Sequence, residues 1–341
     1  MSQCFEKQTR GKVLYVDNNS IYKSIQNKLY LSQDFGKSWK LLLTTPAENW
    51  KDRLAYRFHI AARLLRKGIH HINTFGDQSI GVLYDKKIGL FQNNNWEAGK
   101  SIVGSRPLSF EQIDNNLVFG EYRSNPERSE INVFTFDKDQ IYSKLKMSGI
   151  RHIHGIYLDP YTDKVWITTG DENHEAFIYR TDKEFNKLDI ILSGSQQTRT
   201  IKLLFDEHYV YFGSDAPHEI NHIYKLKKDT KQVSKLVQVG SSVFHGTKVK
   251  NWMFFSTAIE PSKVNKTKEV EIWASPNGDD WKCILKFKKD VFSMRYFQYG
   301  QVFFPIGASN NELWLSLFAT QNSNKSFAIG LNQIQKLFDK I

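Results

Sequence analysis

The sequence predicts an all-β fold, a β-propeller of seven four-stranded blades that occupies residues 1–341 as a single domain. Three observations support this prediction. Aromatic residues make up 14% of the chain, and aromatic and β-branched residues favour strands. Pairs of short alternating strands recur, mostly at intervals of about 36–49 residues, which is the length of a four-stranded blade. A tight-turn motif also appears in two of these repeats.

Seven strand pairs can be placed along the chain, each followed by a polar turn and further short strands. Their innermost strands are predicted to begin near Lys12, His70, Arg106, Arg151, Arg199, Val243 and Phe292. The segment RTIKLLFDEHYVYFGSD is one example, with a strand, an acidic turn and an aromatic-rich strand that ends on a carboxylate. The same spacing also allows six or eight blades.

An insertion near residues 48–68 separates the first two repeats. Leu54, Phe58 and Leu65 lie there at helical spacing, with four arginines largely on the opposite side. This pattern predicts a short helical or irregular segment. It would either pack with its apolar side against the blades or present a basic surface to an anionic polymer or membrane.

The tight-turn motif has the form S-x-D-x-G-x-x-W and occupies residues 32–39. Asp34 can accept hydrogen bonds from backbone N–H groups of the turn, Gly36 can take a positive φ, and Trp39 can pack under the turn. A shortened copy, SPNGDDW, occupies residues 275–281. Both copies predict the outer hairpin of a blade.

Several features bear on where the protein works. The two cysteines, Cys4 and Cys283, are too few for a disulfide framework. Residues 1–12 contain no apolar core of a secretory signal, and no window approaches the ~18 consecutive apolar residues of a membrane span. We therefore expect a cytoplasmic protein without a transmembrane segment.

The formal net charge of +11 suits an anionic partner. No nucleic-acid-binding motif accompanies it, so we expect an anionic oligosaccharide or polysaccharide and no nucleic acid. Motifs of other catalytic classes are absent from the sequence: G-x-S-x-G, the P-loop, G-x-G-x-x-G, H-E-x-x-H and C-x-x-C.

Propeller geometry predicts where a site would form. The innermost strand of a blade begins at the same rim at which the antiparallel second strand ends. Candidate catalytic residues at these ends are Glu121, His152, His154, Asp171, Asp215 and Glu260. Candidate substrate-binding residues at or near them are Arg151, Arg199, His245, Arg295, Gln197 and Tyr122. We expect these side chains to line one polar funnel.

Three kinds of chemistry suit such a funnel. The carboxylates could act as acid and base in glycoside hydrolysis. In a lyase that acts on a uronate, Arg199 would neutralise the sugar carboxylate while His152 or His154 takes the α-proton. The two histidines lie at i and i+2 on one strand face, so they could also hold a divalent metal. We expect no other cofactor, and oligomeric state is open.

Five segments, taken in order, resemble a known family. They are GEY, RHIHG…DPYTD…TTGD, GSQQTR, GSD and STAIE followed by W-x-S-x-x-G-x-x-W, over about residues 106–282. This order resembles bacterial and archaeal propellers with Asp-box (BNR) repeats that are classed as sialidase-like or glycosyl-hydrolase-like. The resemblance implies a propeller fold and a carbohydrate ligand.

The resemblance also implies roles for particular residues. A sialidase-like site would hold a sialic carboxylate with an arginine triad, which strand position assigns to Arg151, Arg199 and Arg295. Glu121 and Tyr122 are similar to the Glu–Tyr pair of sialidases, although neighbouring residues on a strand point to opposite faces. A non-enzymatic scaffold or assembly factor is the alternative, because many propellers use their faces for protein contacts.

Overall fold

The computed structural model describes residues 4–307 and 311–341. In these residues the strands form seven antiparallel sheets of four strands each, and the two-residue strand β27 (Ile306–Gly307) adds in parallel to one of them. The predicted fold class is confirmed, because the protein is a seven-bladed β-propeller in which each four-stranded sheet is one blade.

The backbone packs as two compact units. Unit 1 contains Met1–His70 and Val239–Ile341, and unit 2 contains His71–Gln238. The single domain expected from the sequence stays a prediction.

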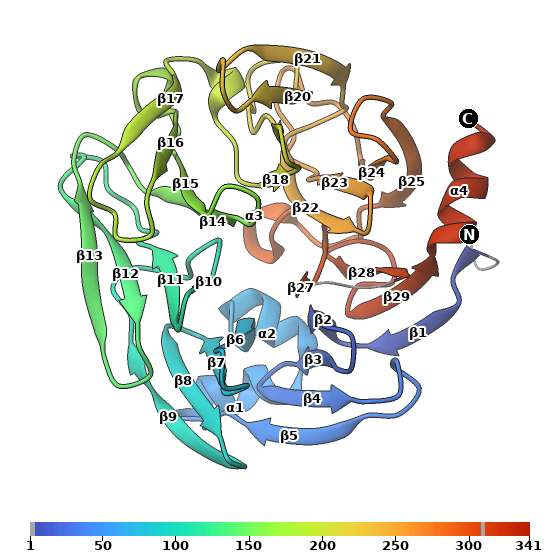
Figure 1. The fold of residues 1–341 in the computed structure, drawn as a ribbon. Helices are drawn as coiled ribbons and strands as arrows, with labels where there is room; N and C mark the ends of the chain where they lie inside the picture. Colours follow the sequence, from blue (N-terminus) through green and yellow to red (C-terminus); the bar gives the residue numbers. More distant parts are fainter. Residues whose placement is uncertain (1–3, 308–310) are drawn as a thin grey trace. The chain divides into compact units, whose positions relative to one another are not determined.

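Unit 2 holds four sheets whose strands hydrogen-bond in chain order (Figure 1). The first has β6 (Ile69–Thr74, which begins at the unit boundary), β7 (Ile80–Tyr84), β8 (Lys87–Gln92) and β9 (Asn95–Ser101). The second has β10 (Glu111–Ile113), β11 (Asn116–Gly120), β12 (Ile131–Phe136) and β13 (Ile141–Met147). The third has β14 (Ile153–Asp159), β15 (Lys164–Thr169), β16 (Phe177–Thr181) and β17 (Asp189–Ser193), with the 3₁₀ turns η2 (Asn173–Glu175) and η3 (Gln196–Thr198). The fourth has β18 (Leu203–Phe205), β19 (Tyr209–Gly213), β20 (His222–Lys227) and β21 (Val233–Gln238).

Unit 1 holds three sheets and the helices. The first sheet has β2 (Lys12–Val16), β3 (Ile21–Ile25), β4 (Lys28–Ser32), β5 (Lys40–Thr44) and β27, and is followed by α1 (Trp50–Arg57) and α2 (His59–Leu65). The second has β22 (Val243–Val249), β23 (Trp252–Thr257), β24 (Glu269–Ser275) and β25 (Lys282–Lys288). The third is assembled from β26 (Gln301–Phe303), β28 (Glu312–Phe318), β29 (Lys325–Gly330) and β1 (Lys7–Arg10), with α3 (Met294–Phe297) before it and α4 (Leu331–Asp339) after β29.

The third sheet of unit 1 joins the two ends of the chain. Its outer strand is β1, which pairs antiparallel with β29, so that Lys7 lies opposite Ala328 and Arg10 lies opposite Lys325. An unpaired β29 would present free N–H and C=O groups along its edge. The amino-terminal strand therefore completes the blade that the carboxy-terminal strands begin.

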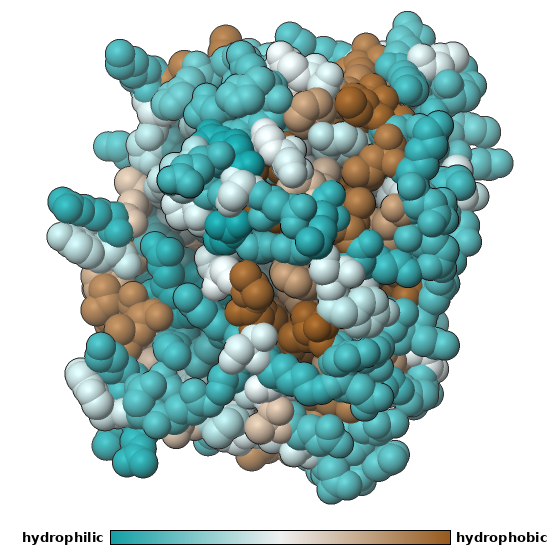
Figure 2. Space-filling view, turned by 90° about the vertical axis from the view of Figure 1, so that its left-hand side faces the viewer, coloured by the Kyte–Doolittle hydropathy of each residue, from teal (hydrophilic) through white to brown (hydrophobic). Residues whose placement is uncertain are grey.

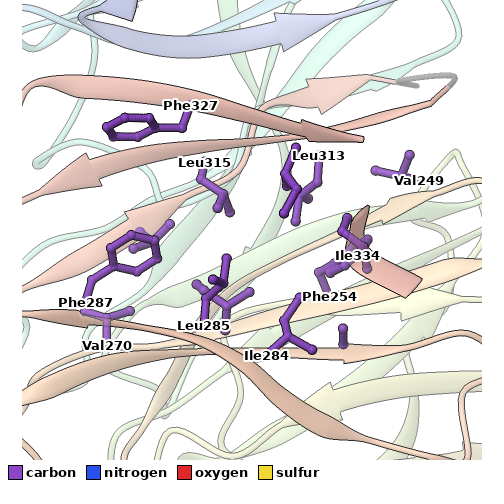
Figure 3. Close-up of a cluster of buried hydrophobic side chains, with 14 of the residues drawn as sticks. Val249, Phe254, Val270, Ile284, Leu285, Phe287, Leu313, Leu315, Phe327 and Ile334 are labelled. Carbon is purple, nitrogen blue, oxygen red and sulfur yellow. The ribbon is translucent and has the colours of Figure 1, made fainter. Parts of the chain in front are cut away.

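Apolar side chains between blades form the cores. Figure 3 shows the largest cluster in unit 1, where Phe254 and Leu285 face Leu315 and Phe327. Helix α4 adds Ile334 to the same cluster. Burying each large apolar side chain contributes about 1.5–3 kcal/mol, so these contacts hold neighbouring blades together.

The outer side of the unit 2 blades is mostly hydrophilic (Figure 2), unlike the apolar cores between blades. Figure 2 faces the side that lies at the left of Figure 1, over β13 and β17, and shows hydrophilic side chains over most of it, with apolar side chains in separate groups. In the outer strand β13, accordingly, only Met147 is buried and the other residues are half-buried or exposed. No helix in the described part of the chain is both long and apolar enough to cross a bilayer.

The insertion near residues 48–68 is helical as predicted, but its apolar side is only partly buried. Leu54 and Phe58 are 42% and 51% exposed, whereas Ala55 is buried and Arg63 is only 4% exposed. Arg63 can be buried because its guanidinium donates to the Asp290 carboxylate at 2.6 Å. This ion pair buries one arginine of the insertion, while Arg53, Arg57 and Arg66 stay exposed.

The two tight-turn motifs lie on the outer hairpins β4–β5 and β24–β25, as the sequence predicts. In the first, the Ser38 backbone N–H donates to Asp34 Oδ1 at 2.9 Å and Gly36 has φ +85°. In the second, Gly278 has φ +82° and its carbonyl accepts from Trp281 Nε1 at 2.9 Å.

Candidate functional site

A group of charged and aromatic side chains comes together in unit 2 at the ends of strands. Arg151 and His152 directly precede β14, and Asp171 follows β15. Because Ile153 pairs with Thr169 across this strand pair, both ends of segment 151–171 lie at the same rim, as expected. The group, here called the Asp171 cluster, consists of Arg151, His152, His154, Asp171, Arg199 and Asp215.

Local backbone features direct the central residues. Asp171 follows Gly170, whose φ is +111° and whose added Cβ would lie 2.5 Å from Ala176 Cα. Only glycine fits this turn, because the backbone conformation and the space both exclude a side chain. On the facing strand, the register of β14 shifts between Ile153 and Gly155, which places a β-bulge at His154. Bulges often re-aim a side chain next to a functional site.

Four basic or aromatic groups surround the Asp171 carboxylate. Arg151 Nη1 donates to Oδ2 at 3.0 Å, and Arg199 Nη2 lies 3.2 Å from Oδ1. On the other side, His154 Nε2 lies 3.4 Å and His152 Nε2 lies 3.6 Å from Oδ1. Both carboxylate oxygens therefore have cationic or imidazole partners.

Arg199 links the third blade of unit 2 to the fourth. Its Nε donates to Asp215 Oδ2 at 3.1 Å, and its Nη1 donates to the Asp171 carbonyl at 3.2 Å. Gln196 Nε2 donates to the same carbonyl at 2.9 Å. Asp171 is therefore held through its backbone as well as its side chain, which makes it a rigid anchor for the cluster.

The two imidazoles are oriented by backbone carbonyls. His152 Nδ1 lies 3.3 Å from the Arg123 carbonyl, and His154 Nδ1 lies 3.3 Å from the Thr200 carbonyl. A carbonyl only accepts hydrogen bonds, so each Nδ1 is a donor, and each Nε2 is the ring atom turned toward Asp171. The two Nε2 atoms face one another at 3.1 Å.

The surroundings shift three pKa values. Burial alone would raise the pKa of the Asp171 carboxyl, but the contacts with His152 and His154 hold it well below its usual range. Burial lowers the pKa of His154 to about 4, so its ring is neutral at pH 7. The ring of Tyr122 packs against His152 at a tilt of 43°, with centroids 4.2 Å apart, and burial raises the pKa of the Tyr122 hydroxyl.

One part of the cluster has the donor set of a metal site. His152, His154 and Asp171 each offer one ligand atom, and these atoms lie within 4.8 Å of one another. Imidazole nitrogen and carboxylate oxygen together are ligands of zinc and related divalent ions.

Other predicted residues of unit 2 lie beside the cluster without contacting Asp171 through their polar groups. Glu121 is buried, and its carboxylate accepts from Arg123 Nε at 2.5 Å and from Asn132 Nδ2 at 2.8 Å. The Gln197 amide instead donates to Glu219 Oε2 at 2.6 Å and accepts from the Tyr224 hydroxyl. Glu121 is thus engaged within its own blade, and Gln197 is engaged by residues of the fourth blade of unit 2.

Three residues predicted to line the site belong to unit 1, and their contacts lie within that unit. His245 Nε2 lies 2.9 Å from Gln301 Oε1, and Glu260 accepts from Ser242 Oγ at 2.7 Å. Arg295 was expected to open a strand, but it lies on the exposed side of helix α3. The prediction of a strand start near Phe292 was therefore wrong, because α3 comes before β26.

Sequence reasoning also missed participants. Gln196 contacts the Asp171 backbone, and its only sequence signal is its place beside Arg199 in GSQQTR. The carbonyls of Arg123 and Thr200 have no sequence signal at all, because every residue carries a carbonyl.

Comparison with known proteins identifies the fold. No family model and no curated protein matches the sequence. Among solved structures, a chain of the Mitotic Checkpoint Complex matches with a TM-score of 0.60 and 9% identity, over 96% of this chain and 94% of that one. The WD40 β-propeller domain of Doa1 matches with a TM-score of 0.59 and 11% identity, over 96% and 94%. The GH74 enzyme of Niastella koreensis matches with a TM-score of 0.53 and 12% identity, over 83% and 47%. At these identities the likeness shows the fold alone, and this chain is similar to known propellers in architecture.

Proposed function

We propose that the protein binds an anionic saccharide at the Asp171 cluster and cleaves it by elimination. The observation that supports this best is the position of Arg151, whose side chain is still 35% exposed while it pairs with Asp171 beside two imidazoles. A partly exposed guanidinium can take a sugar carboxylate as a further, bidentate partner.

Elimination suits the cluster better than hydrolysis. Hydrolysis by two carboxyl groups needs one that stays protonated as the acid. Asp171 has a pKa well below its usual range, and Asp215 and Glu121 are buried in ion pairs with Arg199 and Arg123. Elimination instead needs positive charge against the uronate carboxylate and a lone pair near the α-proton. The guanidinium groups of the cluster supply the positive charge, and its imidazole groups supply the lone pair.

Binding is tested by titrating the protein with a panel of uronate and sialate oligosaccharides in a calorimeter. We expect Arg151→Gln to weaken binding about 10–100-fold, because a hydrogen bond to a charged group contributes about 1.5–3 kcal/mol. Lys187→Gln is the matched control, since it removes one positive charge from an 82% exposed side chain of the same unit. Equal binding by wild type and the Arg151 variant would contradict the proposed site.

The reaction is read from the products. New ultraviolet absorbance at about 235 nm indicates the unsaturated product of elimination. In that step the carbon next to the carboxylate gives its proton to an imidazole, the C–O bond to the leaving sugar breaks as the C=C bond forms, and the leaving oxygen takes up a proton. New reducing ends without this absorbance would replace elimination by hydrolysis. Neither binding nor products across the panel would support a scaffold function instead.

A further inference from the structure

We propose that His152, His154 and Asp171 form a tetrahedral divalent-metal site, with zinc as the ion that fits the ligands best. Two imidazole nitrogens and one carboxylate oxygen make a His₂Asp set. Three protein ligands leave a fourth position for water or a substrate oxygen, which is the ligand count of catalytic zinc sites.

The spacing of the three ligand atoms matches an ion at bonding distance. The atoms are separated by 3.1 Å (Nε2 to Nε2), 3.4 Å (His154 Nε2 to Asp171 Oδ1) and 3.6 Å (His152 Nε2 to Asp171 Oδ1). Two ligands of a tetrahedral zinc lie roughly 3.3–3.6 Å apart, given bonds of about 2.0–2.2 Å. The nearest point equidistant from all three atoms is about 2.0 Å from each, and a tetrahedral ion would lie slightly out of their plane, so it fits with little side-chain movement.

The tautomers of the two histidines also favour a cation. Their Nδ1 protons point at the carbonyls of Arg123 and Thr200, the arrangement that commonly orients metal-binding imidazoles. Both Nε2 atoms and one Asp171 oxygen therefore converge on one point. A divalent cation bound there would replace any proton that these three atoms share.

The arginines of the cluster are compatible with the ion. Arg151 uses Asp171 Oδ2, and Arg199 takes one lone pair of Oδ1 while a second lone pair of that oxygen stays available. These ion pairs place guanidinium groups in the outer shell, where they hold the carboxylate in position.

The charges suggest why an ion would be useful, and this step rests on the proposed function. The charges of the two arginines and the two aspartates of the cluster cancel. A divalent ion would give the cluster an excess of positive charge. A carboxylated sugar could then bind at the open coordination position.

The test uses full-length protein dialysed against EDTA and then titrated with Zn²⁺ in a calorimeter. We expect one ion per chain, and about 100-fold weaker binding in His154→Gln, because removing a ligand costs at least as much as disturbing its outer shell. His208→Gln is the control, since His208 is an exposed histidine in the β18–β19 turn of the same unit. Circular dichroism checks that both variants fold.

Co²⁺ supplies a second readout that does not depend on stability. Tetrahedral cobalt with two imidazoles absorbs strongly in the visible region, and this band should appear with wild type and be lost with His154→Gln. Absence of both heat and colour at millimolar metal would overturn the proposal. Metal binding without saccharide binding would leave the metal site standing and reject the proposed function. Saccharide cleavage by protein that gives neither heat nor colour with metal would reject the metal site and leave the proposed function standing.

Discussion

At the scale of single residues, Gly170 determines where Asp171 lies. We expect Gly170→Ala to destabilise the protein by about 2–4 kcal/mol, because φ +111° is strained for alanine and the new Cβ would meet Ala176 Cα at 2.5 Å. Urea unfolding measures the loss, and calorimetry with Zn²⁺ measures whether the cluster is still assembled.

Gly149 provides the matched comparison in the same unit. Its φ is +76°, but a Cβ there meets nothing within 4 Å. Gly149→Ala should therefore cost only the backbone strain of about 1–2 kcal/mol. If both substitutions cost the same, the close contact at Gly170 does not contribute.

Strand pairing decides which residues of the Asp171 cluster can be predicted from the sequence. Arg151 and Asp171 stand at the two ends of one hairpin, and antiparallel pairing must bring such ends together. Gln197 was expected to bind and Gln196 was overlooked, because a 3₁₀ turn covers both residues and no strand alternation tells which one faces the cluster. The ion pair that engages Glu121 could not be inferred from strand order.

At the scale of elements, the side chain of Arg63 ties the α1–α2 insertion to residues around α3. Arg63 donates to Asp290 at 2.6 Å and to the Phe297 carbonyl at 2.6 Å, and its guanidinium lies over the ring of Phe318 at 5.3 Å. We expect Arg63→Ala to cost about 3 kcal/mol, since it leaves buried polar partners behind. Arg53→Ala, on the exposed side of α1, should change stability by less than about 0.5 kcal/mol.

Thermal unfolding of these two variants gives the comparison. Equal midpoints would mean that the insertion is held by its apolar contacts. The helical spacing of Leu54 and Phe58 correctly predicts that the segment is helical, because spacing follows from the local backbone. It cannot predict which side is buried, because that depends on Asp290, which is far away in the sequence.

At the scale of the whole molecule, the repeat spacing predicts the blades but not how the last one is completed. Six of the seven sheets use strands that are consecutive apart from the short addition of β27, so local spacing is enough to find them. The outer strand of the remaining sheet is β1, with the polar sequence KQTR. Nothing in four polar residues specifies a partner more than 300 positions later.

Deleting residues 1–10 tests the contribution of this strand. We expect the unfolding midpoint to fall by roughly 5–10 °C, because β29 loses its hydrogen-bonded neighbour and becomes an open edge. Adding a synthetic peptide of residues 1–10 should restore part of the loss by strand addition, and a scrambled peptide should not. An unchanged midpoint after deletion would show that β1 adds no stability.

The ion pairs around Asp171 also separate the molecule's charge into two parts that respond to different conditions. The arginines and aspartates of the cluster balance, so the surplus of +11 resides elsewhere on the chain. Physiological salt screens exposed charges over about 8 Å but affects buried pairs far less. Ionic strength should therefore adjust how readily the protein approaches an anionic polymer, while leaving the recognition chemistry of the Asp171 cluster nearly constant.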